Sequence, residues 1–599
     1  MQHKHKKEIP AHNNEKKDSY PKWLPIAVVL LTALLYTKAV LNGFVDYDDN
    51  GFVLNNPYLR DFSWHGVKAI FTTFVYGAYS PLTTVLYFII YHFFRLNPLP
   101  YHLLNVLVHL LNVWLVFKVT LQLSGKKITA LIVMFLFAVH PMNAEPVAWV
   151  SSLKDVLFAF FYLLSLSFYL RYLESGLIVQ YYFITIVFFI VSLMSKSAAV
   201  TLPVLLTAID IYKGRMINIM SLLEKIPFFL LSVLLGILTI FAEKSLGALN
   251  TNMAYYGFIN RIFLLTSAIA SYIIKVIAPL NLSAAHYLPE LINGRLPLIY
   301  YGSLLFLLLI LWLALRKSSF RKEIIFGSCF FIITISVMLQ IIQVGYVHTC
   351  ERYAYITYIG VFYIIGQYIS NTTIKKWRYV TLVAFSVLII MFCFQTEARI
   401  AVWKNDITLS TSIIEKEPDA MRFYFMRANS EKLEGDIQTA LQDYTKCIQL
   451  DSTFEDAYFN RATVFDESSN IQLAIKDYSK LIRLNPKADA FNNRGWEYYK
   501  SGDMKSAMLD YDKAILLDST FSKAYFNRAS IKVSSGDFTG AIEDYNSLLR
   551  MYANDKNAYY YRGKAYLQTK DTINACKDWK KAAELGNEHA LELLRQYCK

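Results

Sequence analysis

Residues 521–554, FSKAYFNRASIKVSSGDFTGAIEDYNSLLRMYAN, are one copy of a pattern that recurs in the C-terminal part of the chain. One arginine, one alanine and one pair of Asp with an aromatic residue return at a fixed phase. The arginines are spaced by 34, 33, 34 and 34 residues: Arg427, Arg461, Arg494, Arg528 and Arg562. The alanines follow the same register: Ala440, Ala474, Ala507, Ala541 and Ala575. Three independent positions in one register predict an array of five structural repeats.

A period of 34 residues, with small residues where two helices cross closely, is the signature of the tetratricopeptide repeat. The repeats are expected near 420–453, 454–487, 488–520, 521–554 and 555–587, after a leading helix over 403–418 and before a capping helix over 589–597. Such solenoids present a concave groove to peptides and proteins. The pattern therefore predicts a binding surface for a protein partner.

The chain before the repeats is unusually apolar. Over all 599 residues, 55% are hydrophobic, only 18% are charged and the mean hydropathy is +0.32. Soluble domains carry about a quarter charged residues, so these values indicate a membrane protein. The first apolar run, WLPIAVVLLTALLYTKAVL over 23–41, lacks a convincing cleavage site and is interpreted as an uncleaved anchor.

Eleven membrane spans are predicted, with the N-terminus inside and the C-terminus outside. They are expected near 23–42, 103–123, 128–141, 156–173, 178–194, 199–212, 226–242, 298–315, 324–343, 354–370 and 378–395. Two ambiguous runs, 81–94 and 262–279, are interpreted as interfacial helices, because that choice leaves the basic loops in the cytoplasm. The fold class is thus all-α: a cytoplasmic basic tail (1–22), a membrane domain (23–398) and a repeat domain (399–599) outside the cytoplasm.

The net charge of +14 belongs to the membrane part. Residues 419–599 hold 26 basic and 26 acidic side chains, whereas the rest holds 34 and 20. A positive-inside bias explains this distribution better than nucleic-acid binding does. No nucleic-acid partner is expected.

Acidic residues cluster in the first outward loop, FVDYDDNGFVLNNP, which begins at Phe44. Asp46, Asp48 and Asp49 directly follow a membrane span. Clustered carboxylates at a low-dielectric boundary raise one another's pKa and can supply a general base. A solvated acidic loop with an Asx turn is an equally good interpretation of the acids alone.

Further ionisable residues fall at the outer ends of the predicted helices. They are His140, Glu145, Lys154 and Asp155 in HPMNAEPVAWVSSLKD, then Lys196, His286, His348, Glu351 and Arg352. Interfacial snorkelling accounts for single basic residues, but poorly for many that meet at one face. Mixed carboxylates and cations suit a phosphate-bearing donor in the membrane beside a base.

Other motifs are weak. The sequence has no P-loop, GxGxxG, HExxH or GxSxG motif. His102 and His109 share a helix face, where helix packing is a better explanation than a metal site. Cys576 and Cys598 form either a disulfide in an oxidising compartment or two buried thiols.

These motifs together resemble a known family. FVDYDD…NNP, YSPLT, HLLNVLVHLLN, HPMNAEPVAWVSSLKDVL, SKSAAVTLP and ERYAY look like the O-mannosyltransferase-type proteins that combine a membrane domain with tetratricopeptide repeats. Those proteins belong to the GT-C glycosyltransferase superfamily, and the bacterial branch is closest in pattern. The resemblance implies a protein glycosyltransferase that takes sugar from a polyprenyl-phosphate donor on the outer face.

The resemblance also assigns roles. Asp48 and Asp49 match the acidic pair implicated in catalysis. The candidate residues for the donor and its phosphate are Arg352, Lys196, Lys154, Glu145, Asp155, Glu351 and His140. The resemblance assigns no cofactor to the enzyme. A divalent metal is compatible with the proposed reaction, but no residue is assigned as a metal ligand. The expected location is a bacterial inner membrane, with the repeats facing the periplasm or exterior. The rival interpretation is a non-enzymatic membrane-anchored scaffold; a transporter fits less well, because the charges crowd one face.

Overall fold

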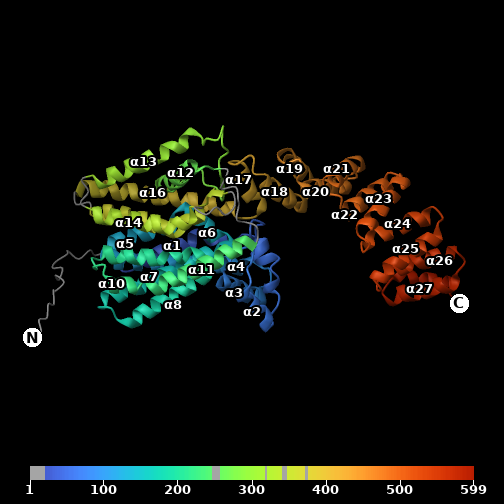
Figure 1. Ribbon diagram of the computed structural model, residues 1–599, viewed down its shortest axis with the longest axis horizontal. Helices are drawn as coiled ribbons and strands as arrows, with labels where there is room; N and C mark the ends of the chain where they lie inside the picture. The colour runs from blue at the N-terminus through green and yellow to red at the C-terminus, as the bar shows by residue number, and fades with distance from the viewer. Residues whose placement is uncertain (1–20, 246–255, 317–319, 340–346, 372–374, 599) are drawn as a thin grey trace, which may run out of the picture. The chain divides into compact units, whose positions relative to one another are not determined.

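The computed structural model describes residues 21–245, 256–316, 320–339, 347–371 and 375–598. Most of the predicted basic tail and the end of the predicted span 324–343 lie outside the described residues. The chain divides into two compact units, Met1–Pro418 and Asp419–Lys599 (Figure 1). Each unit is described here by itself.

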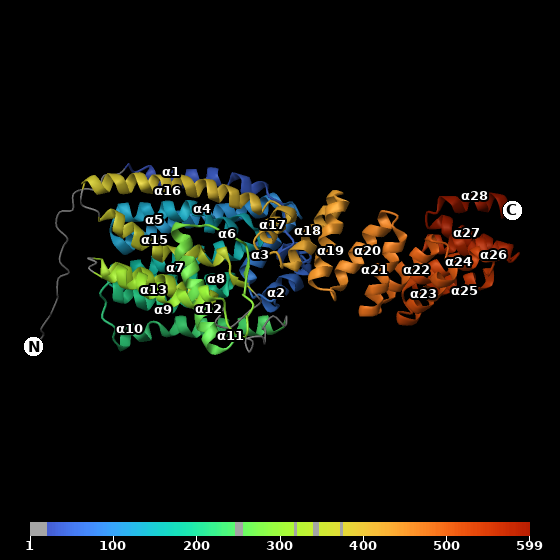
Figure 2. The same cartoon turned by 90° about the horizontal axis from the view of Figure 1, so that it is seen from above.

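The first unit is built almost entirely of helices, and its long helices run nearly side by side (Figures 1 and 2). They are α1 (Leu24–Leu35), α2 (Trp64–Thr72), α3 (Pro81–Phe94), α4 (Pro98–Ser124), α5 (Lys127–Val139), α6 (Ala144–Ala148), α7 (Leu153–Glu174), α8 (Val179–Ser195), α9 (Leu202–Tyr212), α10 (Ile219–Leu223), α11 (Ile226–Ser245), α12 (Phe258–Ile277), α13 (Leu298–Leu315), α14 (Arg321–Ile335), α15 (Ala354–Ser370), α16 (Lys375–Val402) and α17 (Asp406–Ile414). Two short strands, β1 (His286–Tyr287) and β2 (Val347–Thr349), pair antiparallel.

Seven helical segments of the described chain are long and apolar enough to cross a membrane. They are Leu24–Leu41, Pro98–Ser124, Val150–Glu174, Ile219–Ala242, Phe258–Ile277, Leu298–Leu315 and Tyr379–Val402. An eighth is formed if α5 and the segment Pro141–Ala148, bent by 59°, are one span. The bend falls at Pro141, which has no N–H to continue the helix. The protein is therefore a membrane protein with a helical membrane domain.

The prediction of eleven spans exceeds what the described helices support. Within the described residues, the predicted spans at 178–194, 199–212, 324–343 and 354–370 correspond to helices of 17, 11, 15 and 17 residues, which are short for a span. A 17-residue helix such as α8 reaches only about 25 Å, whereas the hydrocarbon core is about 30 Å thick. Conversely, the helix Phe258–Ile277 is long and apolar enough to cross a membrane, although the sequence predicts an interfacial helix there. The predicted orientation in the membrane stays a prediction.

Close packing against neighbouring helices fixes the position of α15. A Cβ added to Gly327 would lie 2.5 Å from the carbonyl oxygen of Gly360, and one added to Gly360 would lie 2.4 Å from that of Gly327. Only glycine permits this approach of α14 and α15. On the other side of α15, the Tyr355 hydroxyl contacts His109 Nδ1 at 2.7 Å and accepts from Asn112 Nδ2 at 3.1 Å. Helix α15 thus packs between α14 and α5, and Tyr355 joins it to α4.

The second unit consists of antiparallel helix pairs, as the repeat period predicts. The pairs are α18 (Met421–Glu434) with α19 (Ile437–Leu450), α20 (Glu455–Glu467) with α21 (Ile471–Leu484), α22 (Ala488–Lys500) with α23 (Met504–Leu517), α24 (Ser522–Ser534) with α25 (Phe538–Met551), and α26 (Lys556–Gln568) with α27 (Thr572–Glu584). Helix α28 (Glu588–Tyr597) caps the last pair. The five alanines that recur at one position of the repeat are all fully buried, where the paired helices cross.

The boundary between the units differs from the predicted 398/399. The structure divides the chain after Pro418, because α16 continues to Val402 and the predicted leading helix, α17, packs on the first unit. The Trp403 ring stacks on Trp149 with centroids 5.1 Å apart. The Gly43 N–H donates to the carbonyl oxygen of Lys404 at 2.9 Å. These contacts also hold the loop after the first predicted span in place.

The recurring arginines form one ion pair in every repeat. In the third repeat, Arg494 donates through Nε and Nη2 to both oxygens of Asp510, at 2.7 and 2.8 Å. Its third nitrogen, Nη1, reaches back to Ser479 of the preceding repeat at 3.0 Å. The same bidentate pair with the aspartate of the same repeat is made by Arg427, Arg461, Arg528 and Arg562. The register of Arg and Asp therefore joins the helices within a repeat and ties successive repeats together.

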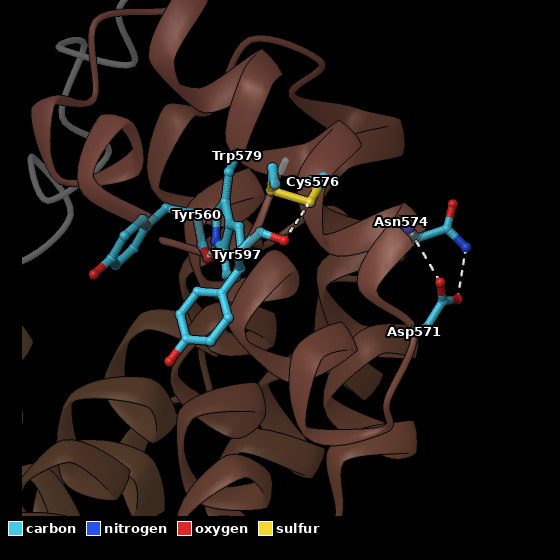
Figure 3. The surroundings of a disulfide bond; sticks show 7 residues. Tyr560, Asp571, Asn574, Cys576, Trp579 and Tyr597 are labelled. Carbon is cyan, nitrogen blue, oxygen red and sulfur yellow. Dashed lines mark hydrogen bonds between the residues drawn. A yellow bond between two sulfur atoms is a disulfide. The ribbon is translucent and has the colours of Figure 1, made fainter. Parts of the chain in front are cut away.

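A disulfide closes the end of the solenoid (Figure 3). Cys576 on α27 and Cys598 after α28 are bonded, with their Cα atoms 5.6 Å apart. The neighbouring Trp579 is fully buried and donates from Nε1 to the carbonyl oxygen of Tyr560 at 3.2 Å. Of the two alternatives that the sequence left open for these cysteines, the structure has the disulfide.

Candidate functional site

Four stretches that are far apart in the sequence meet at one end of the membrane domain. They are the loop after the first span, the start of α7, the residue after α8 and the turn before α15. Two aromatic rings join them. The Trp149 ring centroid lies 5.3 Å from the Arg352 guanidinium and 5.9 Å from Lys154 Nζ. The Tyr353 ring lies 5.3 Å from Arg352 and 5.8 Å from Lys196 Nζ. Three of the predicted cations therefore surround one region.

Asp49 is completely buried and fully hydrogen-bonded. Its Oδ1 accepts from the backbone N–H of Ser151 at 2.9 Å and from the Ser151 hydroxyl at 2.5 Å. Its Oδ2 accepts from the N–H of Val45 at 3.0 Å. Burial raises the pKa of Asp49 to about 7, although these hydrogen bonds act in the opposite direction. Asp49 thus fastens the first loop to the segment that precedes α7.

Asp48 occupies a different environment from its neighbour. Its side chain is 23% exposed, and its Oδ2 lies 3.9 Å from Lys154 Nζ. Lys154 in turn rests on the Phe52 ring at 4.1 Å, which keeps the ammonium directed at the loop. Of the two predicted catalytic carboxylates, Asp48 is the one that an incoming molecule can reach.

The other two cations are held by buried carboxylates. Arg352 Nη1 donates to Glu145 Oε1 at 2.6 Å, and Glu145 is fully buried. Lys196 forms an ion pair with Asp155, which is 2% exposed. Glu145 Oε2 and Asp155 Oδ2 have no hydrogen-bond partner in the described structure. The carboxylates hold the cations in place without using all of their own hydrogen-bonding capacity.

Two of the predicted residues are engaged elsewhere. Both ring nitrogens of His140 contact the backbone, Nε2 at 3.1 Å from the carbonyl oxygen of Val276 and Nδ1 accepting from the Met142 N–H at 3.3 Å. The ring is fully buried among aromatic residues, so its visible role is to fix the bend after α5. Glu351 pairs with Arg399 of α16 at 2.8 Å.

The remaining ionisable residues that the sequence singled out lie outside the cluster. Asp46 is exposed, and its N–H donates to Asp406 Oδ1 at 2.6 Å. His286 Nδ1 contacts Glu417 Oε1 at 3.1 Å, while His348 Nε2 contacts the Ser267 hydroxyl at 3.1 Å. These contacts join β1 and β2 to their neighbours in the first unit.

Sequence reasoning missed four residues of this region. Ser151 and Trp149 lie in the quoted WVSSLKD motif, so their position beside Lys154 could have singled them out. Arg399 and Lys275 gave no such signal, because each is a single basic residue at the end of an apolar run. Only the packing of α12 and α16 against residues 350–352 reveals them.

Among the described residues, no group of three or more His, Cys, Asp or Glu side chains is arranged to hold a metal ion. The divalent metal stays a prediction.

Comparison with known proteins supports the repeats and the membrane-enzyme resemblance. Tetratricopeptide-repeat family models match residues 422–454, 455–487, 488–521 and 526–591. Protein O-mannosyl-transferase Tmtc1 of Drosophila melanogaster is 30% identical over 194 residues, which is 30% of this chain and 22% of that protein. Protein O-mannosyl-transferase TMTC4 of Mus musculus is 31% identical over 168 residues, covering 24% of this chain and 22% of that protein.

The chain thus spans about a fifth of the length of the curated relatives that it matches. The resemblance to the O-mannosyltransferase-type family with tetratricopeptide repeats is confirmed, while nothing in these matches singles out a bacterial branch.

Solved repeat proteins also match the second unit. The crystal structure of YrrB, a TPR protein with an unusual peptide-binding site, is 22% identical and covers 31% of this chain and 97% of that chain, with a TM-score of 0.28. The crystal structure of MamA protein is 21% identical and covers 30% and 97%, with a TM-score of 0.27. At these scores the likeness carries no argument beyond the repeat assignment of the family models.

Proposed function

We propose that this protein is a membrane glycosyltransferase that moves a sugar from a polyprenyl-phosphate donor to a protein Ser or Thr hydroxyl on the non-cytoplasmic face. The observation that carries the proposal is the accessible carboxylate of Asp48 beside three clustered cations. The names of the similar proteins, protein O-mannosyl-transferases, support the reaction class.

Asp48 is the proton acceptor in this proposal. The acceptor hydroxyl gives its proton to Asp48, and its oxygen forms the new bond to the anomeric carbon of the sugar. The bond from that carbon to the phosphate oxygen breaks, and the polyprenyl phosphate leaves with the electron pair. Arg352 and Lys196 stabilise the negative charge that develops on the leaving phosphate. Lys154, within 3.9 Å of Asp48, orients that carboxylate.

Asp49 is a positioning residue in this scheme. Its side chain is completely buried, and its three hydrogen bonds join the loop that carries Asp48 to the segment that carries Lys154. Removing Asp49 is therefore expected to misplace Asp48 relative to the cations, and such shifts of position are costly in rate.

The repeats hold the acceptor protein, and we place them outside the cytoplasm. The disulfide at the end of the solenoid supports that side of the membrane, because disulfides persist in oxidising compartments. The bacterial inner membrane remains the proposed location, on the sequence pattern of the bacterial branch.

The test is sugar transfer in membranes from a labelled polyprenyl-linked donor. Asp48→Asn keeps the shape of the side chain but cannot accept the proton, so transfer should fall by about 10²-fold or more. Asp46→Asn is the matched control, since Asp46 lies in the same loop with an exposed side chain outside the cluster. Full transfer by Asp48→Asn would refute the proposed base. No transfer by the wild type with any of a broad panel of donors would favour the rival function, a membrane-anchored scaffold.

A further inference from the structure

Tyr76 occupies a strained and exposed position on a hairpin turn. Val75 and Ala78 exchange two backbone hydrogen bonds, at 3.1 and 2.9 Å. Tyr76 and Gly77 between them have positive φ angles of 48° and 72°. A two-residue turn with two positive φ angles is of type I′, which favours Asn, Asp or Gly at its first position and strains a bulky residue there. The tyrosine at this position is 51% exposed.

Packing accounts for only part of the Tyr76 ring. The ring rests on the backbone of Gly51, where a Cβ atom would lie 2.4 Å from Cδ2 of Tyr76. Its centroid lies 5.9 Å from that of the buried Phe52 ring in an edge-on contact. The rest of the ring meets solvent, and an asparagine would relieve both this exposure and the backbone strain. Strain of this kind is typical of residues that contact a ligand.

The turn lies at the edge of the candidate site. The Phe52 ring that Tyr76 contacts also carries Lys154 Nζ, 4.1 Å from its centroid. Lys154 Nζ in turn lies 3.9 Å from Asp48 Oδ2. One buried ring therefore joins the exposed Tyr76 to the accessible carboxylate and its cation.

The helix that follows the turn, α3, is fastened to two other segments of the site. The Thr83 hydroxyl donates to the carbonyl oxygen of Ser195, the residue before Lys196, at 3.4 Å. The Tyr87 hydroxyl donates to the carbonyl oxygen of Val150, in the segment that precedes α7, at 2.7 Å. The hairpin is thus held on one side by the loop after the first predicted span and on the other by α3.

The chemistry of the site indicates what packs on the exposed ring. One face of a hexose carries mostly C–H bonds, whose partial positive charge is attracted to the negative π face of an aromatic ring. The tyrosine hydroxyl at the tip of the ring remains among water and sugar hydroxyls. A carboxylate, clustered cations and an exposed aromatic ring together suit a sugar that is joined to a phosphate.

We propose that the Tyr76 ring packs against the sugar of the donor, on the side of the site formed by the loop that carries Asp48. The inference rests on the proposed function and adds to it the residue that contacts the sugar. An acceptor peptide also has apolar surface that such a ring binds, and the experiment separates the two.

The test compares the binding of polyprenyl-phosphate mannose and of sugar-free polyprenyl monophosphate to the full-length protein in phosphatidylcholine nanodiscs. The choice of mannose follows the names of the similar proteins. Tyr76→Asn removes the ring and suits the turn, so Kd for the mannose-bearing lipid should rise about fivefold, as expected for one lost aromatic contact. Its Kd for the sugar-free lipid should not change. Tyr76→Phe keeps the ring and should retain the affinity.

Two controls separate sugar contact from a structural role. Tyr552→Asn is the matched control, because Tyr552 is 54% exposed and lies in the repeat domain, and both Kd values should stay unchanged. The melting temperature of Tyr76→Asn without lipid should equal or exceed that of the wild type, because asparagine is favoured in this turn. A weaker affinity in a variant of unreduced stability assigns the loss to the missing ring.

Several outcomes would overturn the inference. Unchanged affinity of Tyr76→Asn for the mannose-bearing lipid would do so, as would equal binding of the two lipids by the wild type. An equal loss for the sugar-free lipid would assign Tyr76 to the carrier. A lower melting temperature in Tyr76→Asn would make the ring a support of the loop, and a loss of affinity for a soluble acceptor peptide alone would assign it to the acceptor.

The two proposals fail separately. Asp48→Asn should abolish transfer, while its binding of the mannose-bearing lipid should still depend on Tyr76. Tyr76-dependent binding of the sugar by a protein that transfers none would leave this inference standing and end the proposed function.

Discussion

Removing the disulfide between Cys576 and Cys598 should loosen the end of the repeat array. The bond closes a loop with a sequence separation of 22 residues. In the chain-entropy treatment, a loop of that size stabilises the folded state by about 3 kcal/mol. A solenoid repeat contacts only its neighbours, so the loss is expected to fall on α26–α28 and not on the whole array.

Hydrogen exchange in the full-length protein measures this effect locally. A loss of about 3 kcal/mol makes local opening about 10²-fold more frequent, because each 1.4 kcal/mol is a factor of ten. Peptides from α26–α28 should therefore exchange about 10²-fold faster in Cys576→Ala/Cys598→Ala. Peptides from α18 and α19 are the internal control. Wild-type protein treated with a reductant should reproduce the change without any substitution.

Two results would refute this reasoning. Unchanged exchange of α26–α28 would show that the hydrophobic cap around Trp579 holds the last repeat without the bond. Equally faster exchange in every repeat would show that the array unfolds as one unit, against nearest-neighbour coupling.

Two further predictions concern the repeats. Arg494→Lys should lower the free energy of unfolding of the array by about 2 kcal/mol, because lysine cannot hold both oxygens of Asp510 and reach Ser479 as well. Urea unfolding measures this loss, with substitution of the exposed Lys513 in Lys513→Arg as the control. An unchanged urea midpoint in Arg494→Lys would contradict the prediction. Glu431 is buried, which raises its pKa to about 7 from the 4.5 of a free side chain. The folded state therefore keeps a proton that the unfolded state loses, and the free energy of unfolding should fall as pH rises from about 4.5 through 7. Glu431→Gln should flatten this part of the pH dependence, and an unaltered slope of urea midpoint against pH would rule Glu431 out.

The repeat domain could be predicted from the sequence almost completely. The recurring Arg, Ala and Asp-aromatic positions are local signals, because each repeat packs only against the next one along the chain. In the structure the alanines lie at the helix crossings, and each arginine binds the aspartate of its own repeat. The predicted boundary lies too early in the chain, since α17 has the character of a repeat helix in sequence but packs on the membrane domain.

The membrane domain was predictable as a class but not in detail. Apolar runs located the helices, because hydrophobicity is a property of each segment by itself. The described residues hold seven or eight helical segments with the length and hydropathy of a span, fewer than the eleven predicted, because loops and prolines such as Pro141 end several helices early. Part of the candidate site could be predicted from the sequence, because Asp48, Lys154 and Arg352 are charged residues at the ends of apolar runs.

What only the tertiary structure decided is which charges meet and which of them are compensated. Asp48 and Asp49 are neighbours in sequence, yet one faces the cations and the other is closed in by Ser151 and Val45. Lys275 is a single lysine at the end of an apolar run, and only the structure shows that it is buried within electrostatic reach of Glu351. The energy of a charge depends on its solvation and on groups that are distant along the chain, and the sequence alone does not encode either quantity locally.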